Sequence, residues 1–582
     1  MEKPWLAHYE SVVPHSLTYP QVSLFGTLEN SARKYPDRPA LHLVLRYLGP
    51  ISLGARLSYR ELLNEVNRFA AALHALGVRK GDRVALMLPN LPQFVIAFYG
   101  AMRVGAIVVN TNPTYTAREL EHQFSDAGAE TVILLSPFYA RFKEIQADTP
   151  VRRVIVADVS DYVRAPFNAL VDRNLRKDGL LAQVPEGEGV NRFRPLLNAH
   201  PELPPAVDVA PDDIALFQYT GGTTGVPKAA MLAHCNLVAN IEQIRAWMPS
   251  LVQGQERCIG ALPFFHIYGM TVAMLFTIYH GSEVIILPNP RHIETIMQII
   301  HREKASLYPG VPAMYIGIIN HPDVKKYDLR SVKACLSGAA PLPMEVQIKF
   351  GEITGGRLIE GYGLTEAAPV THANPIFGER RAGSIGLPWP DVDARIVDPD
   401  TLEEQQAGQV GELWVRGPQV MRGYWNKADE TKNVIAADGW LRTGDIARRD
   451  EDGYFYIVDR LKDIIIVSGF NVVPREVEEV LFEHPKVQEA VAAGIPDSYR
   501  GESVKAYVVL KAGQTATADE LIAFCKERLA PYKVPRQIEF RSELPKTMVG
   551  KFLRRVLVEE EKKKLAAGQG AAKGQMGQAA NG

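Results

Sequence analysis

One segment of ten residues contains the residue types that bind phosphate. It reads Tyr219-Thr220-Gly221-Gly222-Thr223-Thr224-Gly225-Val226-Pro227-Lys228. Its three glycines let backbone N–H groups approach an anion without a Cβ in the way, and its threonine hydroxyls add donors. Lys228 adds a point charge suited to phosphate. A Walker A loop is excluded, because Pro227-Lys228-Ala229 stands where that motif needs Gly-Lys-Ser/Thr. A glycine turn with exposed threonines would explain a shorter run, but ten residues in this order predict a phosphate site.

Four further segments follow along the chain. They are Gly361-Tyr362-Gly363-Leu364-Thr365-Glu366, Leu441-Arg442-Thr443-Gly444-Asp445, Asp459-Arg460-Leu461-Lys462-Asp463 and Pro545-Lys546-Thr547-Met548-Val549-Gly550-Lys551. In the first of these, an aromatic ring between glycines can stack on a purine while the backbone approaches it. Taken alone, a glutamate or a lysine is most often a solvated surface group. In content and order, however, the five segments resemble those of the adenylate-forming superfamily, which comprises acyl-CoA synthetases, firefly luciferase and the adenylation domains of peptide synthetases. The resemblance extends from about residue 25 to residue 560.

The resemblance implies a binding site for ATP. Its predicted contacts are Thr220, Gly221, Gly222, Thr223, Thr224, Gly225, Lys228, Gly338, Ala339, Gly361, Tyr362, Gly363, Thr365, Asp445 and Arg460. Tyr362 would lie against adenine, with Gly338 and Ala339 nearby. Thr365 would hydrogen-bond the α-phosphate. Asp445 would accept hydrogen bonds from both ribose hydroxyls, a geometry that one carboxylate satisfies well.

The resemblance also implies a metal ion and a set of catalytic groups. Glu366 would hold Mg²⁺ together with Thr220, since magnesium prefers hard oxygen ligands and substrate phosphates. Adenylation brings a carboxylate against the α-phosphate, so a positioned ammonium stabilises the charge that accumulates in the transition state. Lys551 is predicted to supply this ammonium. Thr365, Glu366 and a histidine beside the substrate carboxylate, His266, complete the predicted catalytic set.

The predicted fold class is α/β with several domains. The large N-terminal domain, residues 1–460, would contain parallel-sheet βαβ subdomains and a small β-barrel-like part, and would hold ATP and the acyl group. A hinge at residues 461–463 would connect it to a small mobile α+β domain, residues 464–566, that carries the catalytic lysine. Residues 567–582 consist mainly of glycine, alanine and glutamine without periodicity, which predicts a disordered tail.

The predicted hinge residue is Lys462. By analogy with the family, one arrangement of the domains would place Lys551 in the site for adenylation, and a second would remove it for thioester formation. Ser468, Gly469 and Phe470 would then face a channel for coenzyme A.

The segment Leu262-Pro263-Phe264-Phe265-His266-Ile267-Tyr268-Gly269-Met270 is predicted to contribute to an acyl pocket. Most of its side chains would pack in the core, whereas His266, Tyr268, Gly269 and Met270 are assigned to the pocket. A small residue and an adaptable methionine could leave room for, or gate, an alkyl chain. Among subfamilies, the sequence most resembles bacterial long-chain fatty acid:CoA ligases. The predicted reaction therefore converts a fatty acid, ATP and coenzyme A into acyl-CoA, AMP and pyrophosphate.

Three alternatives remain open. A ligase for small or aromatic acids would keep the same motifs. An adenylation module that loads a carrier protein would normally be followed by a carrier domain, and the featureless C-terminal tail disfavours it. A non-catalytic protein that kept the fold would be expected to lose Lys551, Glu366 or the glycine–threonine segment, and all of these are present.

Composition argues against nucleic acid as a partner. The chain of 582 residues has 65 Lys and Arg against 66 Asp and Glu, and a nucleic-acid binder usually has an excess of basic residues. The four cysteines are widely spaced, which favours reduced, buried thiols over a zinc site or a disulfide framework. No signal peptide or apolar run of about 20 residues is recognisable, so the expected setting is the cytoplasm. Peripheral contact with the inner face of the membrane and a homodimer stay open.

Apolar periodicity predicts the elements that position these residues. Residues 58–77 are expected to form an amphipathic helix that opens with the capping-box pair Ser58 and Glu61. A strand over 84–88, a helix over 94–102 and a strand over 106–109 follow, and this alternation predicts a largely parallel sheet.

Two later regions differ from this pattern. Residues 162–205 combine basic residues (Arg164, Arg173, Arg176 and Lys177) with prolines, and are interpreted as a surface excursion, with a solvated loop favoured over a membrane-touching segment. After residue 459 the sequence predicts a helix near 474–483, strands near 488–493 and 504–510, and a helix that opens with Thr517 and Glu520.

Overall fold

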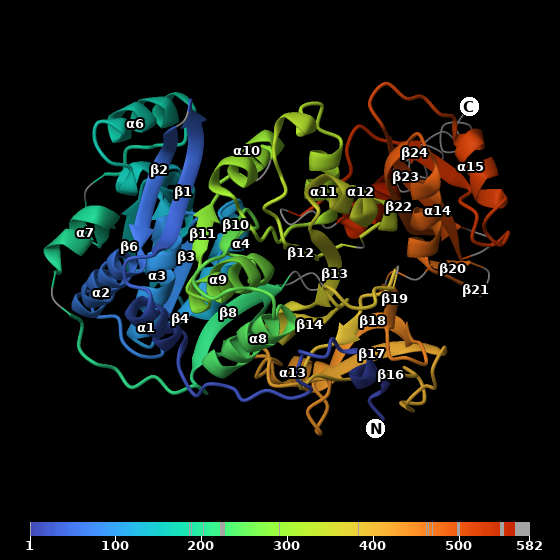
Figure 1. Ribbon diagram of the computed structural model, residues 1–582, viewed down its shortest axis with the longest axis horizontal. Coiled ribbons are helices and arrows are strands. Elements are labelled where there is room, and N and C mark those ends of the chain that lie inside the picture. Colours follow the sequence, from blue (N-terminus) through green and yellow to red (C-terminus); the bar gives the residue numbers. More distant parts are fainter. Residues whose placement is uncertain are drawn as a thin grey trace, which may run out of the picture. The chain divides into compact units, whose positions relative to one another are not determined.

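The computed structural model describes residues 2–49, 51–185, 187, 189–201, 203–220, 227–289, 292–340, 342–381, 383–460, 463, 465–467, 470–497, 501–547 and 552–564 (Figure 1). The chain forms two compact units. The first comprises Met1–Ala394, Val415–Arg442 and Asp452–Tyr454, and the second comprises Arg395–Trp414, Thr443–Glu451 and Phe455–Gly582. The predicted α/β class with parallel-sheet subdomains and a smaller α+β part is confirmed. The domain limits at 460 and 464 stay a prediction.

A seven-stranded sheet, counted over the described residues, forms one layer of the first unit. Its order is β7 (Val190–Arg192), β6 (Arg153–Ala157), β5 (Thr131–Leu135), β3 (Arg83–Met87), β4 (Ile107–Asn110), β8 (Ile214–Thr220) and β9 (Lys228–Ala233). The strands from β7 to β8 pair in parallel and β9 pairs antiparallel with β8. β3 is apolar and buried from Val84 to Met87, as expected for a parallel strand with helices on both faces of its sheet. The predicted alternation of strands and helices is thereby confirmed.

Two helices of this layer, α2 (Tyr59–Ala75) and α4 (Ala117–Ala127), begin with a capping box. The layer also includes α3 (Pro92–Arg103), α5 (Tyr139–Ile145) and α8 (His234–Trp247). At α2 the predicted capping box is present, since Glu61 N donates to Ser58 Oγ at 3.2 Å and Ser58 N donates to Glu61 Oε2 at 2.7 Å. At α4, Thr116 and Glu119 form the same box, which our sequence analysis did not identify.

A second layer of the first unit is built from two four-stranded sheets. One has the order β10 (Arg257–Gly260), β11 (Glu283–Ile286), β1 (Pro39–Leu48) and β2 (Ile51–Ser58); the other has β12 (Ala334–Ser337), β13 (Arg357–Gly363), β14 (Val370–Ala373) and β15 (Leu387–Pro388). Bridges on both sides of Leu307, to Cys258 and to Ala334, connect β10 with β12. The helices here are α1 (Leu24–Lys34), α9 (Phe276–Tyr279), α10 (Ile293–Glu303), α11 (Pro312–Ile319) and α12 (Met344–Thr354).

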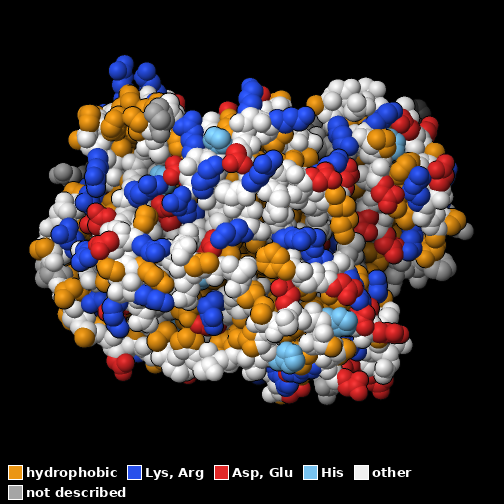
Figure 2. Space-filling model, viewed as in Figure 1, with side chains coloured by type: hydrophobic (Ala, Val, Ile, Leu, Met, Phe, Trp, Pro, Cys, Tyr) orange, Lys and Arg blue, Asp and Glu red, His pale blue; other side chains and the backbone are white. Residues whose placement is uncertain are grey.

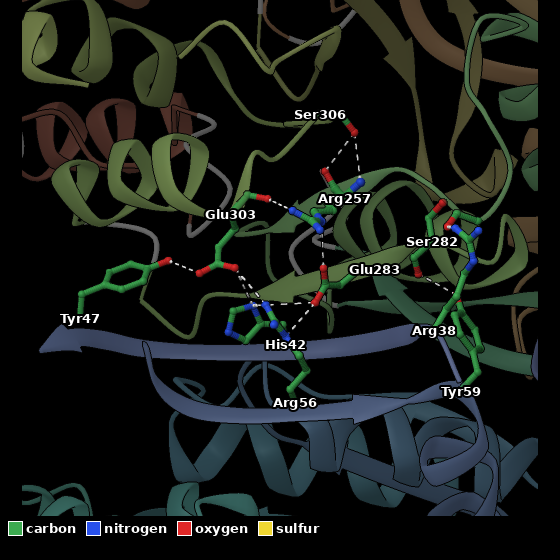
Figure 3. Close-up of polar contacts among 11 residues, drawn as sticks. Arg38, His42, Tyr47, Arg56, Tyr59, Arg257, Ser282, Glu283, Glu303 and Ser306 are labelled. Atoms are coloured by element: carbon green, nitrogen blue, oxygen red, sulfur yellow. Dashed lines mark hydrogen bonds and ion pairs between the residues drawn. The ribbon is translucent and has the colours of Figure 1, made fainter. Parts of the chain in front are cut away.

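A network of charged side chains fastens the β1–β2 hairpin to β11 and α10 (Figure 3). Arg56 Nε lies 3.2 Å from Glu283 Oε1, and Arg56 Nη2 lies 2.9 Å from Glu303 Oε2. Arg56 also donates to His42 Nδ1 at 2.8 Å. Burial, with the positive charges of Arg56 and Arg257, lowers the pKa of His42 to about 3. The histidine is therefore a neutral acceptor at the centre of this network.

The second unit contains the C-terminal sheet and its helices. The sheet has the order β21 (Phe470–Val472), β20 (Ile465–Val467), β23 (Gly501–Leu510) and β22 (Val487–Asp497), with β24 (Gln537–Phe540) beside β23. Helices α14 (Pro474–Glu483) and α15 (Ala518–Lys526) pack on it. The predicted helix over 474–483, both predicted strands and the helix opening at Thr517 are confirmed, and Glu520 N donates to Thr517 Oγ1 at 3.2 Å.

The interpretation of residues 162–205 as a loop was wrong. This region contains α6 (Phe167–Lys177), the edge strand β7 and α7 (Phe193–Ala199). Val171 of α6 packs in a small apolar cluster with Leu53 and Val163, and Phe193 of α7 is buried. The prolines misled the sequence analysis, because Pro166 stands immediately before α6, where a helix tolerates it.

Three further predictions concern the cysteines, membrane-spanning helices and the C-terminal tail. The four cysteines are free, with Cys258, Cys335 and Cys525 buried and Cys235 half-buried. The helices within the described residues are all too short or too polar to cross a membrane. The predicted disordered tail lies outside the described residues.

Candidate active site

The phosphate segment begins and ends on two paired strands. Thr220 is the last residue of β8, Lys228 is the first residue of β9, and the two residues are register partners. Thr220 Oγ1 donates to the carbonyl of Lys228 at 3.4 Å. Gly221, Gly222, Thr223, Thr224 and Gly225 lie outside the described residues. Both flanks of the predicted phosphate site are thus held by the seven-stranded sheet.

The Gly361–Gly363 segment ends β13 and pairs with β14. A Cβ at Gly363 would lie 2.0 Å from the carbonyl oxygen of Pro369, and one at Gly361 would lie 2.5 Å from Leu336 Cδ1. Glycine is therefore required at Gly363, where the neighbour is backbone, whereas at Gly361 a larger residue would have to displace the Leu336 side chain. Tyr362 between them is half-buried, and its ring packs edge-on against His372 at 5.9 Å. Part of the ring remains accessible, as stacking on a base requires.

The Ser337–Ala339 segment follows β12 and has an unusual backbone. Ala339 has φ +67°, a conformation that residues with a Cβ rarely adopt and that is concentrated at functional sites. A Cβ at Gly338 would lie 3.1 Å from the ring of Tyr268. The Tyr268 hydroxyl donates to the carbonyls of Leu336 at 2.5 Å and Gly310 at 3.2 Å. Tyr268, which we assigned to the acyl pocket, thus packs against Ser337–Ala339, the segment predicted to lie near adenine (the adenine segment).

Thr365 and Glu366 lie in a single 3-10 turn, η7 (Thr365–Ala367). Both are half-buried. The backbone carbonyl of Glu366 accepts a hydrogen bond from Met421 N at 2.8 Å, and its carboxylate oxygen Oε1 accepts one from the Tyr424 hydroxyl at 2.7 Å. Glu366 is therefore fixed through its backbone and through its side chain.

Lys228 and Glu366 both contact Tyr424, the first at its ring and the second at its hydroxyl. Lys228 Nζ lies 5.5 Å from the centroid of the Tyr424 ring and forms an ion pair with Glu430 of α13 (Ala428–Val434). Burial, and then the negative charge of Glu366, raise the pKa of the Tyr424 phenol well above its usual range, so the phenol stays protonated. Our sequence analysis missed Tyr424 and Glu430. No local pattern could identify them, because their contacts span 58 and 202 positions.

The last two residues of the predicted acyl segment, Gly269 and Met270, are the first two of a rare π-helical stretch, η5 (Gly269–Leu275). Such turns occur frequently at functional sites. His266 is half-buried and accepts a hydrogen bond from Tyr268 N at its Nδ1, 3.3 Å away. Met270 is fully buried, and its Sδ accepts a hydrogen bond from Asn110 Nδ2 at 3.3 Å. A Cβ at Gly269 would lie 2.3 Å from the Pro263 carbonyl oxygen, so the space beside this glycine is occupied by backbone and is not room for an alkyl chain.

Asp445 belongs to the second unit. It lies on β18 (Leu441–Arg449) in the sheet with β16 (Asp393–Val397), β17 (Val410–Arg416) and β19 (Phe455–Arg460), and is 7% exposed. Its N–H donates to Thr443 Oγ1 at 3.1 Å, and Gly444 N donates to Glu412 Oε1 at 2.9 Å. Gly444 has φ +72° with open space around it, so the turn itself requires glycine.

Several predicted residues fall outside what the structure describes. Lys551, Lys462, Ser468 and Gly469 are among them. The backbones of Arg460 and Phe470 lie at register positions opposite Asp445 and Val467 respectively. The roles of these residues stay predictions.

The oxygen donors at this site fit a magnesium ion. Thr220 and Glu366 supply a hydroxyl and a carboxylate, the ligand types that magnesium prefers. Within the described residues, no group of three or more His, Cys, Asp or Glu side chains could hold a metal ion. Magnesium usually keeps several waters and is bound through one or two carboxylates together with substrate phosphates.

Comparison with known proteins agrees with this geometry. Residues 28–425 match the family described as AMP-binding enzyme, and residues 476–551 match the AMP-binding enzyme C-terminal domain. The chain is 48% identical to a long-chain-fatty-acid–CoA ligase of Bacillus subtilis (strain 168), over 96% of this chain and 98% of the relative. It is 41% identical to a ligase of the same description from Escherichia coli O157:H7, over 97% of this chain and 99% of the relative.

A solved structure supports the same assignment. The anthranilate CoA ligase AuaEII in complex with anthranoyl-AMP superposes with a TM-score of 0.81 at 26% identity, over 94% of this chain and 99% of that one. Matches to both family models and near-complete coverage of close relatives establish the family. This chain belongs to the AMP-binding enzymes.

Proposed function

We propose that this protein is an AMP-forming ligase that converts a long-chain fatty acid to its coenzyme A thioester. In the first step a carboxylate oxygen attacks the α-phosphorus of ATP, the bond to the β-phosphate oxygen breaks, and pyrophosphate leaves. In the second step the thiol of coenzyme A attacks the acyl carbon, loses its proton, and displaces AMP. The near-full-length identity to fatty-acid–CoA ligases carries this proposal.

The residues of the first unit account for the binding of two anions. The strand ends at Thr220 and Lys228 present a hydroxyl and a positive charge to the nucleotide phosphates. Tyr362 presents a partly accessible ring to the adenine, while the Gly338–Ala339 backbone lines it. Thr365 donates to the α-phosphate, and His266 lies beside the substrate carboxylate. Asp445 and Arg460 take the ribose roles that the family resemblance implies.

Thr220 and Glu366 are the residues that would hold magnesium. When bound, the ion neutralises phosphate charge that would otherwise repel the incoming carboxylate. Lys551 supplies the remaining positive charge where the carboxylate meets the α-phosphate, and its attraction to the negative charge there is stronger in the transition state than in the ground state.

The chain-length preference rests on the relatives. Met270 is fully buried on η5 and is our candidate for the residue that closes the acyl pocket. A ligase for aromatic acids is the second candidate, because the anthranilate CoA ligase shares this fold. A panel of acids of increasing chain length separates the two.

We further propose that α6 touches the membrane surface. Ile51, Phe167, Leu170 and Leu180 are 55%, 41%, 40% and 52% exposed, respectively. Exposed basic residues stand among them, namely Arg164, Arg173, Arg176 and Lys177. Figure 2 shows hydrophobic side chains gathered over α6 with Lys and Arg atoms above them. Apolar side chains flanked by positive charge suit an anionic lipid surface.

Isotope exchange between pyrophosphate and ATP tests the central proposal. Exchange should require a fatty acid and should be lost in Lys551→Ala, whereas this variant should still convert supplied acyl-AMP and coenzyme A to the thioester. The reason is that the lysine acts on charge that exists only while the adenylate forms or breaks down to ATP. Well-folded wild-type protein that shows no exchange with any monocarboxylic acid would contradict the assignment, and equal loss of both half-reactions would contradict the role of Lys551.

A further inference from the structure

A five-residue stretch of backbone connects the exit of the phosphate segment with Glu366. Residues 421–425 lie along β9 and form the hydrogen bonds Trp425 N to Ala229 O, Met231 N to Gly423 O and Arg422 N to Met231 O, each 2.9 Å long. At its other end Met421 N donates to Glu366 O at 2.8 Å. The stretch therefore holds Lys228, the first residue of β9, and the η7 turn in a fixed relation.

Tyr424 is the central side chain of this stretch. It is 8% exposed, and its backbone forms a bridge with Ala230 of β9. Its hydroxyl donates to Glu366 Oε1 at 2.7 Å, while the face of its ring lies 5.5 Å from Lys228 Nζ. One rigid aromatic side chain thus contacts both groups that are assigned to the phosphate end of the site.

We propose that Tyr424 is a positioning residue for Glu366. The hydroxyl takes one carboxylate oxygen, Oε1, and this contact fixes the rotation of the carboxylate about its Cγ–Cδ bond. The second oxygen, Oε2, has no partner among the described residues and is the one left for the cation on the nucleotide. The inference rests on the proposed function, because it assigns to Glu366 the cation-binding role given above.

A carboxylate without such a partner would rotate and would have to be ordered when the cation binds. Outer-shell partners of metal-binding carboxylates typically account for about 10-fold to 100-fold in metal affinity. The burial of Tyr424 makes the partner rigid, because its ring lies beside Lys228 and its backbone is bridged to Ala230 of β9. Tyr424 therefore acts through Glu366 and need not touch the nucleotide.

Tyr424→Phe tests this inference, since it keeps the ring beside Lys228 and removes only the hydroxyl. Calorimetric binding of a non-hydrolysable ATP analogue should be measured across a series of Mg²⁺ concentrations, without fatty acid or coenzyme A. We expect the Mg²⁺ concentration for half-maximal binding to rise about 10-fold or more, in line with the effect of outer-shell partners elsewhere. In turnover assays, kcat at saturating Mg²⁺ should stay close to that of the wild type.

Tyr162→Phe is the matched control. The Tyr162 hydroxyl donates to the Glu65 carboxylate at 2.6 Å, so this variant also removes a phenol–carboxylate hydrogen bond from the first unit. It should lower the free energy of unfolding by a similar amount and leave the Mg²⁺ dependence unchanged. If Tyr424→Phe behaves like Tyr162→Phe, with lower stability and an unaltered Mg²⁺ dependence, the inference is wrong.

A double-mutant cycle with Glu366→Gln checks the route of the effect. If Tyr424 acts through the carboxylate, removal of its hydroxyl in the Glu366→Gln background should change the Mg²⁺ dependence little. An equal shift in both backgrounds would mean that Tyr424 acts by another route and would overturn the inference. Failure of the proposed function itself looks different, because the wild-type protein would then show no fatty-acid-dependent exchange between pyrophosphate and ATP.

Discussion

At the scale of single residues, Tyr268 lies where two sequence motifs meet. The aromatic-rich segment 262–270 was expected to supply pocket walls, and Ser337–Ala339 was expected to lie near adenine. Tyr268 belongs to the first and supports the second, through its ring under Gly338 and its hydroxyl bonds to the carbonyls of Leu336 and Gly310. The sequence around Tyr268 could not predict these hydrogen bonds, because both carbonyls lie more than 40 positions away along the chain.

Tyr268→Phe should loosen the adenine segment at a modest cost in stability. The Leu336 carbonyl keeps a donor, since the Tyr315 hydroxyl also reaches it at 3.2 Å. We therefore expect the free energy of unfolding to fall by about 1 kcal/mol, the net value of one hydrogen bond. If ATP binding must also order the Gly338–Ala339 backbone at a cost of about 1 kcal/mol, KM for ATP should rise about fivefold. Denaturant titration and steady-state kinetics give the two values.

Tyr315→Phe is the control for this change. Its hydroxyl donates to the same Leu336 carbonyl and to the carbonyl of Tyr308 at 2.8 Å. The Tyr315 side chain packs beside Gly310, whereas that of Tyr268 packs beside Gly338. It should lower stability without changing KM for ATP. Equal effects of both variants on KM would show that the hydrogen bonds of the Tyr268 hydroxyl are not what orders the adenine segment.

At the scale of elements, sequence patterns predicted those helices and strands whose signals are local. The capping pair Ser58 and Glu61 and the helix over 474–483 were predicted because the residues that determine them lie within one or two turns. Helices α6 and α7 were missed, because their short apolar faces pack against residues distant in sequence, Leu53 for α6 and Phe69 for α7, and because Pro166 stands at the start of α6. The segment 421–425 was missed for a related reason, since its hydrogen-bond partners belong to β9 and η7.

The His42 network should make the anchoring of the β1–β2 hairpin dependent on pH. Folded His42 has its pKa lowered to about 3, whereas in the unfolded chain it titrates near pH 6.5, so the unfolded state binds more protons in between. The free energy of unfolding should therefore fall as pH decreases from about 6.5 towards 4, by up to about 1.4 kcal/mol per pH unit.

His42→Asn isolates this contribution, since it keeps an acceptor for Arg56 and removes the titrating group. The stability difference between wild type and variant should be constant above pH 7 and should shrink as pH falls below about 6.5. Denaturant titrations of both proteins over pH 5 to 8 measure it. A difference that stays constant over this range would mean that His42 does not remain neutral in the folded protein.

At the scale of the whole molecule, the two compact units divide the predicted machinery. Thr220, Lys228, Tyr362 and Glu366 belong to the first unit, and the second contains Asp445. Each unit has its own apolar core, as expected for parts that can move separately. The hinge at Lys462 stays a prediction from the family resemblance, because that residue lies outside the described part of the chain.

Binding to anionic vesicles should depend on the α6 surface and not on overall charge. The formal net charge is −1, so the molecule as a whole has no attraction to a negative surface. Arg173→Glu combined with Arg176→Glu should abolish most co-sedimentation with vesicles that contain phosphatidylglycerol, since each basic side chain near the surface contributes about 1 kcal/mol. Lys562→Glu with Lys563→Glu makes the same charge change on exposed residues of the second unit and should have little effect. Equal losses in both double variants would argue against a dedicated surface.

The pairing of Thr220 with Lys228 has a consequence for how the phosphate segment can vary. Antiparallel partners keep their Cα atoms about 5 Å apart, so the sheet fixes both ends of the connection whatever residues lie between them. Chain-closure entropy changes slowly with length, by about 0.6 kcal/mol for each doubling. Insertions and substitutions between these anchors should therefore alter affinity for the nucleotide far more than they alter folding, which makes this connection a place where laboratory evolution can tune the enzyme at little risk to its scaffold.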